Sequence, residues 1–129
     1  MAVVLVVEDE DQVRVLAESY LQEQGHRTFS ASTVNEALAV LDEAENVDLL
    51  FTDIGLKGEL EAGLDLAKQA VTRRPGLKVL YTTDQGITDG MTALFVEKSA
   101  VLPKPYTVNQ LQAMLTVRFS INQTNGPTN

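Results

Sequence analysis

The sequence predicts an α/β fold in which a doubly wound, five-stranded parallel sheet lies between two helical layers, a three-layer αβα arrangement. Short apolar runs alternate with segments of helical periodicity from one end of the chain to the other. The runs lack a clean alternation of apolar and polar residues, which is typical of strands that are covered on both faces. Right-handed crossovers between such strands place helices on both sides of the sheet. The 129 residues suffice for one domain of this kind.

A strand is predicted at residues 2–7, followed by a helix at about 11–24 and a second strand at 27–31. Gly25 is suited to end this helix, because glycine adopts a left-handed backbone conformation without strain. One face of the helix carries apolar residues at helical spacing: Val13, Leu16, Ala17, Tyr20 and Leu21. His26 has no partner in the local sequence and is expected at the surface.

The second helix is predicted at about 34–45, where Glu36 can complete a capping box with Thr33. A third strand follows at 48–52 and a third helix at about 62–73. The apolar face of that helix consists of Leu64, Leu66, Ala67 and Ala70. These elements continue the alternation of strand and helix.

The remaining strands are predicted at 77–82 and 100–102, with the last helix at about 107–118. The helix between the two strands is expected to be short, frayed or mobile, because Gly86 and Gly90 interrupt it at about 1 kcal/mol each relative to alanine. The last helix is expected to bury Val108, Leu111, Met114 and Leu115.

Composition limits the range of functions. The domain is predicted to comprise residues 1–119, and the polar tail at 120–129, which has nothing to bury, is expected to be disordered.

The 10 basic and 18 acidic residues give a net charge of −8, which should repel nucleic acid and anionic membranes. Either ordinary solubility or a basic partner would account for this charge. The absence of cysteine excludes disulfides and thiolate metal sites and favours a reducing cytoplasm. The apolar runs are too short to span a bilayer, and the acids after the first run exclude a signal-peptide core.

Acidic residues follow two of the predicted strands. Glu8 and Asp9 come directly after the first strand, and Asp53 follows the third. In an open α/β sheet the ligand crevice lies at the carboxyl ends of the strands, where the winding direction reverses. If the first and third strands are neighbours there, the three carboxylates share that crevice. Like charges so close repel unless a cation lies among them, and Mg²⁺ suits such hard oxygen ligands. Asp9 and Asp53 would bind it directly, and Glu8, one methylene longer, through water.

Two further strand ends carry Thr82 and Lys104, a hydroxyl and a cation suited to holding a phosphoryl group. Asp53 is the candidate nucleophile, because a carboxylate can attack phosphorus to form an acyl phosphate. Lys104 would pair with one phosphoryl oxygen and the Thr82 hydroxyl would donate to another, and phosphoryl transfer depends mostly on such positioning and charge neutralisation. Each residue alone has an ordinary structural explanation: a helix-capping acid, a turn residue, a strand-end threonine, a solvated lysine. Their joint placement at strand ends favours phosphoryl transfer.

In order, the motifs Val-Val-Glu-Asp-Glu, Thr-Asp, Tyr-Thr-Thr and Lys-Pro-Tyr resemble the receiver domain of two-component response regulators over about residues 2–118. The resemblance implies the flavodoxin-like strand order 2-1-3-4-5. It also implies that Asp53 is the phosphoacceptor and that Lys104 precedes a cis peptide bond to Pro105. Thr82 matches the hydroxyl residue that moves toward the phosphoryl group, and Thr83 matches the small residue that leaves it access. The implied Mg²⁺ ligands are Glu8, Asp9, Asp53 and the backbone carbonyl of Gly55.

Three positions depart from the family pattern. Val101 stands where receivers that switch through a threonine–aromatic pair carry tyrosine or phenylalanine, so switching by aromatic rotation is not expected. Lys57 replaces a common proline, and Gly63 comes about two residues later than usual. Together with Gly86 and Gly90, these departures suggest signalling through rearrangement of the loop and the fourth helix.

The resemblance implies a cytoplasmic phosphoacceptor that takes its phosphoryl group from a histidine kinase or a histidine phosphotransfer protein. Its downstream partner would be a protein bound by the face of the fourth helix, fifth strand and fifth helix, with no nucleic acid or membrane involved. The chain would not be an enzyme that acts on other molecules. At most it would catalyse its own phosphorylation and dephosphorylation. It offers no output module after the fifth helix, so a stand-alone receiver, a phosphorelay shuttle or a receiver excised from a hybrid kinase is expected.

Two other functions compete with this hypothesis. A phosphatase that turns over through an aspartyl phosphate usually has a second aspartate two residues after the nucleophile, but position 55 is glycine. A protein-binding receiver that no longer accepts phosphate is disfavoured by the intact acidic pair, acceptor, threonine and lysine.

Overall fold

Five parallel strands form one sheet in the order β2-β1-β3-β4-β5 in the computed structural model, which describes residues 1–122. This order confirms the predicted fold class and topology. The strands are β1 (Val3–Val7), β2 (Arg27–Ala31), β3 (Leu49–Asp53), β4 (Lys78–Thr83) and β5 (Ser99–Pro103). The helices are α1 (Asp11–Glu23), α2 (Val34–Glu43), α3 (Ala62–Arg73), α4 (Asp89–Ala93) and α5 (Val108–Phe119). Nine elements lie within a few residues of their predicted positions, and the fourth helix, for which no bounds were predicted, lies between the last two strands as expected.

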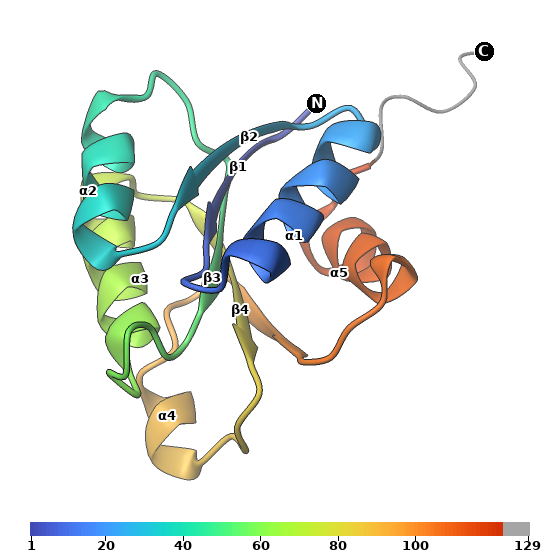
Figure 1. The fold of residues 1–129 in the computed structure, drawn as a ribbon. Coiled ribbons are helices and arrows are strands. Elements are labelled where there is room, and N and C mark those ends of the chain that lie inside the picture. Colours follow the sequence, from blue (N-terminus) through green and yellow to red (C-terminus); the bar gives the residue numbers. More distant parts are fainter. Residues whose placement is uncertain (123–129) are drawn as a thin grey trace.

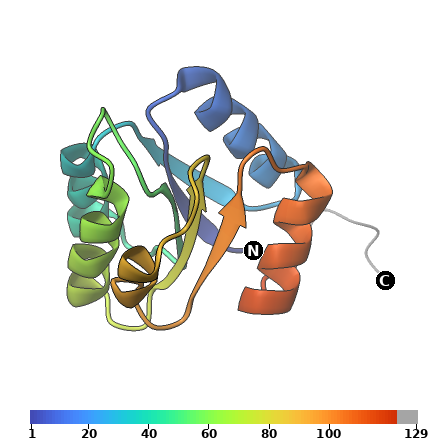
Figure 2. The same cartoon turned by 90° about the horizontal axis from the view of Figure 1, so that it is seen from below.

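Helices cover both faces of the sheet, as the three-layer prediction requires. Figure 1 shows α1 and α5 on one side and α2 and α3 on the other, and the turned view in Figure 2 separates the two layers. Successive strand residues point to opposite faces. Leu5 and Val7 therefore join the core under α2 and α3, whereas Val4 and Val6 join the core under α1 and α5. Burial on both faces explains why the strand sequences are continuously apolar.

Helix capping follows the predicted motif only in part. The Thr33 hydroxyl accepts from the backbone N–H of Glu36 at 3.1 Å, which confirms the first half of the box at α2. The Glu36 carboxylate, however, accepts from the backbone N–H and hydroxyl of Ser32 rather than from Thr33. A complete capping box is found instead at α5, between Thr107 and Gln110. The reach of the Glu36 side chain, which sequence spacing does not determine, explains the difference.

Two apolar residues predicted to be buried are exposed. Leu16 in α1 is 69% exposed, and Val108 in α5 is 49% exposed. Leu16 lies about a quarter of a turn from the centre of the buried face of α1 at 100° per residue. Val108 is the first residue of its helix, at the end of the buried face. The spacing therefore identified the correct helices but overstated the width of their packed faces.

The described chain continues past the predicted end of the domain at residue 119. Ser120 ends α5 in the left-handed conformation, with φ 56°. Ile121 then donates its N–H to the carbonyl of Leu115 at 2.9 Å and buries its side chain in the core under α1 and α5. The predicted disordered tail thus begins too early. Residues 123–129 of that tail lie outside the described residues.

The short α4 agrees with the prediction for the segment that contains Gly86 and Gly90. It has five residues, and Met91 is its one buried side chain. Whether the segment frays or moves stays a prediction. None of the helices between residues 1 and 122 combines the length and apolarity needed to cross a lipid bilayer.

His26 is buried, which contradicts its predicted surface position. The residue is 6% exposed, and its Nδ1 accepts from the backbone N–H of Ala2 at 3.2 Å. The carbonyl of Ala2 accepts from the backbone N–H of Arg27, the residue after His26, at 2.9 Å. Since the pairing partner lies 24 residues away, local sequence offered no sign of it.

Acidification should destabilise the protein through His26. Burial lowers the pKa of His26, so its stabilising contribution is complete above the ordinary histidine pKa of about 6.5 and is lost as the pH falls through the lower folded-state pKa. Protonated Nδ1 can no longer accept from Ala2, a loss of about 1 kcal/mol. Urea unfolding near pH 7.5 and near pH 5 should show this loss in the wild type and not in His26→Gln. Equal pH dependence in the two proteins would contradict it.

Candidate functional site

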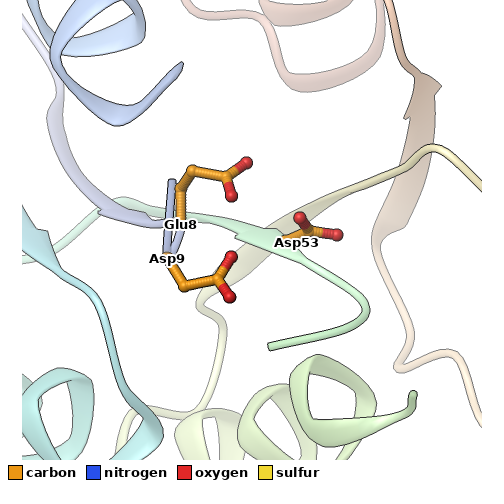
Figure 3. Close-up of side chains that lie close together, drawn as sticks. All are labelled: Glu8, Asp9 and Asp53. Atoms are coloured by element: carbon orange, nitrogen blue, oxygen red, sulfur yellow. The ribbon is translucent and has the colours of Figure 1, made fainter. Parts of the chain in front are cut away.

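Three carboxylates gather at the carboxyl edge of the sheet. Glu8 and Asp9 follow β1, Asp53 ends β3, and these two strands are hydrogen-bonded neighbours. One oxygen from each residue lies within 4.8 Å of the others, and Figure 3 shows the three side chains close together at the ends of their strands. Glu8 and Asp53 are buried, and Asp9 is half-buried. The predicted convergence of these residues is confirmed.

Lys104 lies between two of the carboxylates. Its Nζ is 2.6 Å from Oε1 of Glu8 and 2.8 Å from Oδ2 of Asp53. Its backbone N–H donates to the carbonyl of Thr83 at 2.9 Å, so the end of β5 is fixed to the end of β4. The peptide bond from Lys104 to Pro105 is cis, as the resemblance implied.

The charges of this site depend on one another. Burial alone would lower the pKa of Lys104, but hydrogen bonds to Asp53 and Glu8 outweigh it and raise that pKa above its ordinary range. Burial raises the pKa of the Glu8 carboxyl, with a smaller contribution from the Asp53 charge, despite the opposing effect of Lys104. The lysine therefore stays charged, whereas the glutamate loses part of its preference for ionisation.

Asp9 is held by the loop between β3 and α3. Its Oδ2 accepts from the backbone N–H of Lys57 at 2.9 Å. Burial works against ionisation of Asp9, but hydrogen bonds, that of Lys57 first, outweigh it and lower its pKa. A proline, which many family members carry at position 57, has no N–H to donate.

The loop around Lys57 is a tight turn. Leu56 and Glu59 exchange two backbone hydrogen bonds of 3.0 and 2.9 Å, and Lys57 and Gly58 between them have φ values of 52° and 78°. Two consecutive positive φ values are typical of a type I′ turn, in which glycine is favoured at the second position. Sequence reasoning missed this contact, although the Lys-Gly pair was a signal for the turn.

Gly55 and the two threonines lie at the same edge, but not all their polar groups point to the carboxylates. The backbone N–H of Gly55 donates to Oδ1 of Asp53 at 3.3 Å. The Thr82 hydroxyl donates to the carbonyl of Leu102 at 2.7 Å, although Thr82 is paired with Asp53 in the sheet. The Thr83 hydroxyl accepts from the N–H of Gln85 at 3.1 Å. Neither hydroxyl is hydrogen bonded to the Asp53 carboxylate.

Tyr106 lies near the charged residues of the site, and the sequence analysis assigned it no role. Its ring packs on Phe51, with ring centroids 5.9 Å apart. Burial raises the pKa of Tyr106 to about 12, so its hydroxyl stays neutral. The signal in the sequence was its place two residues after Lys104.

The donor set fits a hard divalent cation. Glu8, Asp9 and Asp53 offer carboxylate oxygens, with Lys104 as the one lysine bonded to two of them. Mg²⁺ prefers such ligands and usually binds through one or two carboxylates together with waters and phosphate oxygens. The same groups place a nucleophilic carboxylate beside a cationic side chain, an arrangement suited to phosphoryl transfer.

The sequence matches the family of the response regulator receiver domain over residues 4–116. The regulatory protein VanR of Enterococcus faecium is 28% identical over 116 residues, which cover 90% of this chain and 49% of VanR. The DNA-binding transcriptional regulator NtrC of Salmonella typhimurium is 29% identical over 136 residues, covering 98% of this chain and 28% of NtrC. The chain thus spans half or less of these two relatives.

Among solved structures, the fold is similar to that of the response regulator TrrA of Thermotoga maritima, determined in complex with Mg²⁺-BeF. The TM-score is 0.76 at 25% identity, with 92% of this chain and 99% of TrrA covered. The matched family, that of receiver domains, is a family of signalling domains rather than of classical enzymes. The chain belongs to the family of response regulator receiver domains of two-component systems.

Proposed function

We propose that Asp53 accepts a phosphoryl group from the phosphohistidine of a histidine kinase or a histidine phosphotransfer protein. The observation that carries this proposal is the position of Asp53, buried beside Lys104 and within one cluster with Glu8 and Asp9. A carboxylate oxygen of Asp53 attacks phosphorus, the P–N bond breaks, and its electron pair stays on the imidazole nitrogen. Lys104 then pairs with a phosphoryl oxygen in place of the Asp53 oxygen that it contacts now.

Asp9, Asp53 and the carbonyl of Gly55 would hold Mg²⁺, with Glu8 bound through water, and the metal would supply positive charge for the equatorial phosphoryl oxygens. Receiver domains bind Mg²⁺ at such an acidic pocket, and the carboxylate cluster here agrees with that property. The Thr82 hydroxyl has one proton, which it now donates to Leu102. To donate to the phosphoryl group it must leave Leu102, while the small Thr83 side chain leaves the group accessible.

The phosphorylated protein switches the binding of a downstream protein at the face of α4, β5 and α5. A new dianionic group near Lys104 and Thr82 can favour a second conformation by stabilising the two states differently. We place this reaction in the cytoplasm, in agreement with the absence of cysteine. That the chain itself contacts no nucleic acid stays a prediction from its net charge of −8, since NtrC is named as a DNA-binding protein.

Asp53→Asn should abolish phosphoryl uptake, because an amide oxygen is a poor nucleophile toward phosphorus. Intact-protein mass spectrometry after incubation with Mg²⁺ and acetyl phosphate should show one added phosphoryl group on the wild type and none on the variant. Chelation of the metal should suppress uptake by the wild type. Asp84→Asn is the matched control, because Asp84 is an exposed acid just after β4.

Two outcomes would overturn the proposal. Continued uptake by Asp53→Asn would show that another residue is the nucleophile. No uptake by the wild type from either acetyl phosphate or a phosphorylated histidine phosphotransfer protein would favour a receiver that binds proteins without phosphorylation.

A further inference from the structure

Tyr81 occupies an unusual place next to the phosphoryl site. It lies in β4 immediately before Thr82, and it has the largest side chain among the described residues that are less than 2% exposed. Alternate strand residues face opposite sides of the sheet. The Thr82 hydroxyl therefore points to the side of α1 and α5, whereas Tyr81 belongs to the core on the side of α2 and α3.

The Tyr81 side chain contacts the segment that follows α4. Its hydroxyl accepts from the backbone N–H of Val96 at 3.2 Å. Its ring stacks on Phe95, with centroids 4.7 Å apart and an interplanar angle of 27°. A phenylalanine would fill nearly the same volume, but a buried hydroxyl requires a hydrogen bond. The hydroxyl of Tyr81 thus specifies where Val96 must lie.

The segment that these contacts hold is otherwise weakly attached. Residues 84–94 are exposed apart from Met91, and α4 projects below the rest of the ribbon in Figure 1. At the start of the segment, the N–H of Gln85 donates to the Thr83 hydroxyl. Few buried apolar contacts and an exposed backbone are features of segments that open at low free energy. Tyr81 therefore attaches the residues that follow α4 to the sheet, together with Ser99 of β5, whose hydroxyl donates to the carbonyl of Val96 at 2.6 Å.

We propose that Tyr81 is the positioning residue that couples the phosphoacceptor edge to α4, in place of an aromatic side chain on β5. The proposal rests on the phosphorylation of Asp53 proposed above. Asp53 is paired with Thr82 across β3 and β4, so a phosphoryl group on Asp53 lies beside the end of β4, and its contacts there shift that strand end. Tyr81 is covalently joined to Thr82 and moves with it, and its hydrogen bond transmits the movement to Val96.

The neighbouring strand supports this role for Tyr81. Val101 is paired with Tyr81 across β4 and β5, so the two side chains share a face of the sheet. Valine has no hydroxyl and no ring with which to hold Phe95 or Val96. The aromatic contact with the end of α4 is therefore supplied by β4.

Tyr81→Phe tests the coupling because it removes the hydroxyl and keeps the ring. The exchange rate of the Val96 amide, measured by NMR, should rise about 3- to 10-fold, as expected for the loss of one hydrogen bond. Phosphoryl uptake at Asp53 should be retained. The chemical-shift changes that phosphorylation causes at Phe95 and Val96 in the wild type should fall by at least half.

Tyr20→Phe is the matched control. It removes a hydroxyl from a buried tyrosine that donates to Gln112 at 3.3 Å on the opposite side of the sheet. This control should leave the exchange and shifts of Val96 as in the wild type. Phe95→Leu, which removes the ring stack by a separate route, should weaken the phosphorylation response in the same direction as Tyr81→Phe.

The coupling is refuted if Tyr81→Phe keeps wild-type exchange at Val96 and wild-type phosphorylation shifts at residues 95 and 96. If no protein in the set takes up a phosphoryl group, the proposed function fails and the coupling fails with it. The exchange rates of the Val96 amide in the unphosphorylated wild type and Tyr81→Phe still test whether Tyr81 holds the segment after α4. The two failures are therefore distinguishable.

Discussion

Replacing Lys104 by methionine should destabilise the protein by about 3 kcal/mol near neutral pH, because it leaves two buried carboxylates without their cation. Glu8 and Asp53 both contact the Lys104 ammonium, and their side chains are only 5% and 11% exposed. Methionine keeps most of the length of the side chain but provides no charge and no donor. The measurement is urea unfolding of the wild type and Lys104→Met at the same ionic strength.

The destabilisation should depend on pH in a defined direction. Burial and the Asp53 charge raise the pKa of Glu8, whereas Lys104 lowers it. Without Lys104, the pKa of Glu8 should therefore rise further above its ordinary value. A carboxyl with a raised folded-state pKa contributes stability that is complete below its unfolded pKa and is lost as the pH rises through the folded value. As the pH is lowered from about 7.5 to about 5, the difference in unfolding free energy between the wild type and Lys104→Met should therefore become smaller.

A second substitution and added metal complete this test. Glu8→Gln in the Lys104→Met background removes one of the unpaired charges and should restore part of the lost stability. Mg²⁺ should stabilise Lys104→Met more than it stabilises the wild type, because a bound cation replaces the missing charge among the carboxylates. A Lys104→Met protein as stable as the wild type, with the same pH dependence and the same response to Mg²⁺, would contradict the assigned role of the lysine.

Gly63→Ala should have a comparably large effect, a loss of about 3 kcal/mol or more, because overpacking here involves backbone atoms. A Cβ at position 63 would lie 1.9 Å from the carbonyl oxygen of Asp53 and 2.9 Å from Cα of Ile54. The N–H of Gly63 already donates to the carbonyl of Ile54 at 2.7 Å, so α3 starts directly against the end of β3. Alanine must push the helix and the strand apart.

Because the displaced strand end is Asp53, Gly63→Ala should also slow phosphoryl uptake from acetyl phosphate. Thermal unfolding and intact-protein mass spectrometry measure the two effects in one preparation. Gly86→Ala is the control, since a Cβ at position 86 meets nothing within 4 Å. Equal stability and equal uptake for Gly63→Ala and Gly86→Ala would show that α3 and β3 separate freely, against the tight contact in the structure.

The sequence predicted the parts of the fold that depend on local pattern. The apolar runs located β1, β3 and β4 because both faces of these strands are buried. The placement of acids and a lysine at strand ends predicted the cluster, because parallel strands bring their carboxyl ends to one edge. The strand order itself came from the resemblance to receivers, since apolar runs do not specify which strands are neighbours.

Features that depend on distant partners were missed. His26 is buried and hydrogen bonded to Ala2, and Ile121, which follows the last helix, is buried in the core under α1 and α5. The present partner of the Thr82 hydroxyl, the carbonyl of Leu102 on the next strand, was also not predicted, whereas its movement toward a phosphoryl group stays a prediction. A pattern of residue types indicates which face of an element is apolar. It does not indicate which of several acceptors a side chain will choose.

The two oxygens of the Asp53 carboxylate are both engaged before any reaction begins. Oδ1 accepts from the N–H of Gly55 at 3.3 Å, and Oδ2 lies 2.8 Å from the ammonium of Lys104. In the reaction proposed above, attack by Oδ2 would bring phosphorus close to the place that the ammonium now occupies, so Lys104 would have to move from Asp53 to a phosphoryl oxygen. The strength of this ion pair would then contribute to the free-energy barrier that the resting protein must cross before it is phosphorylated.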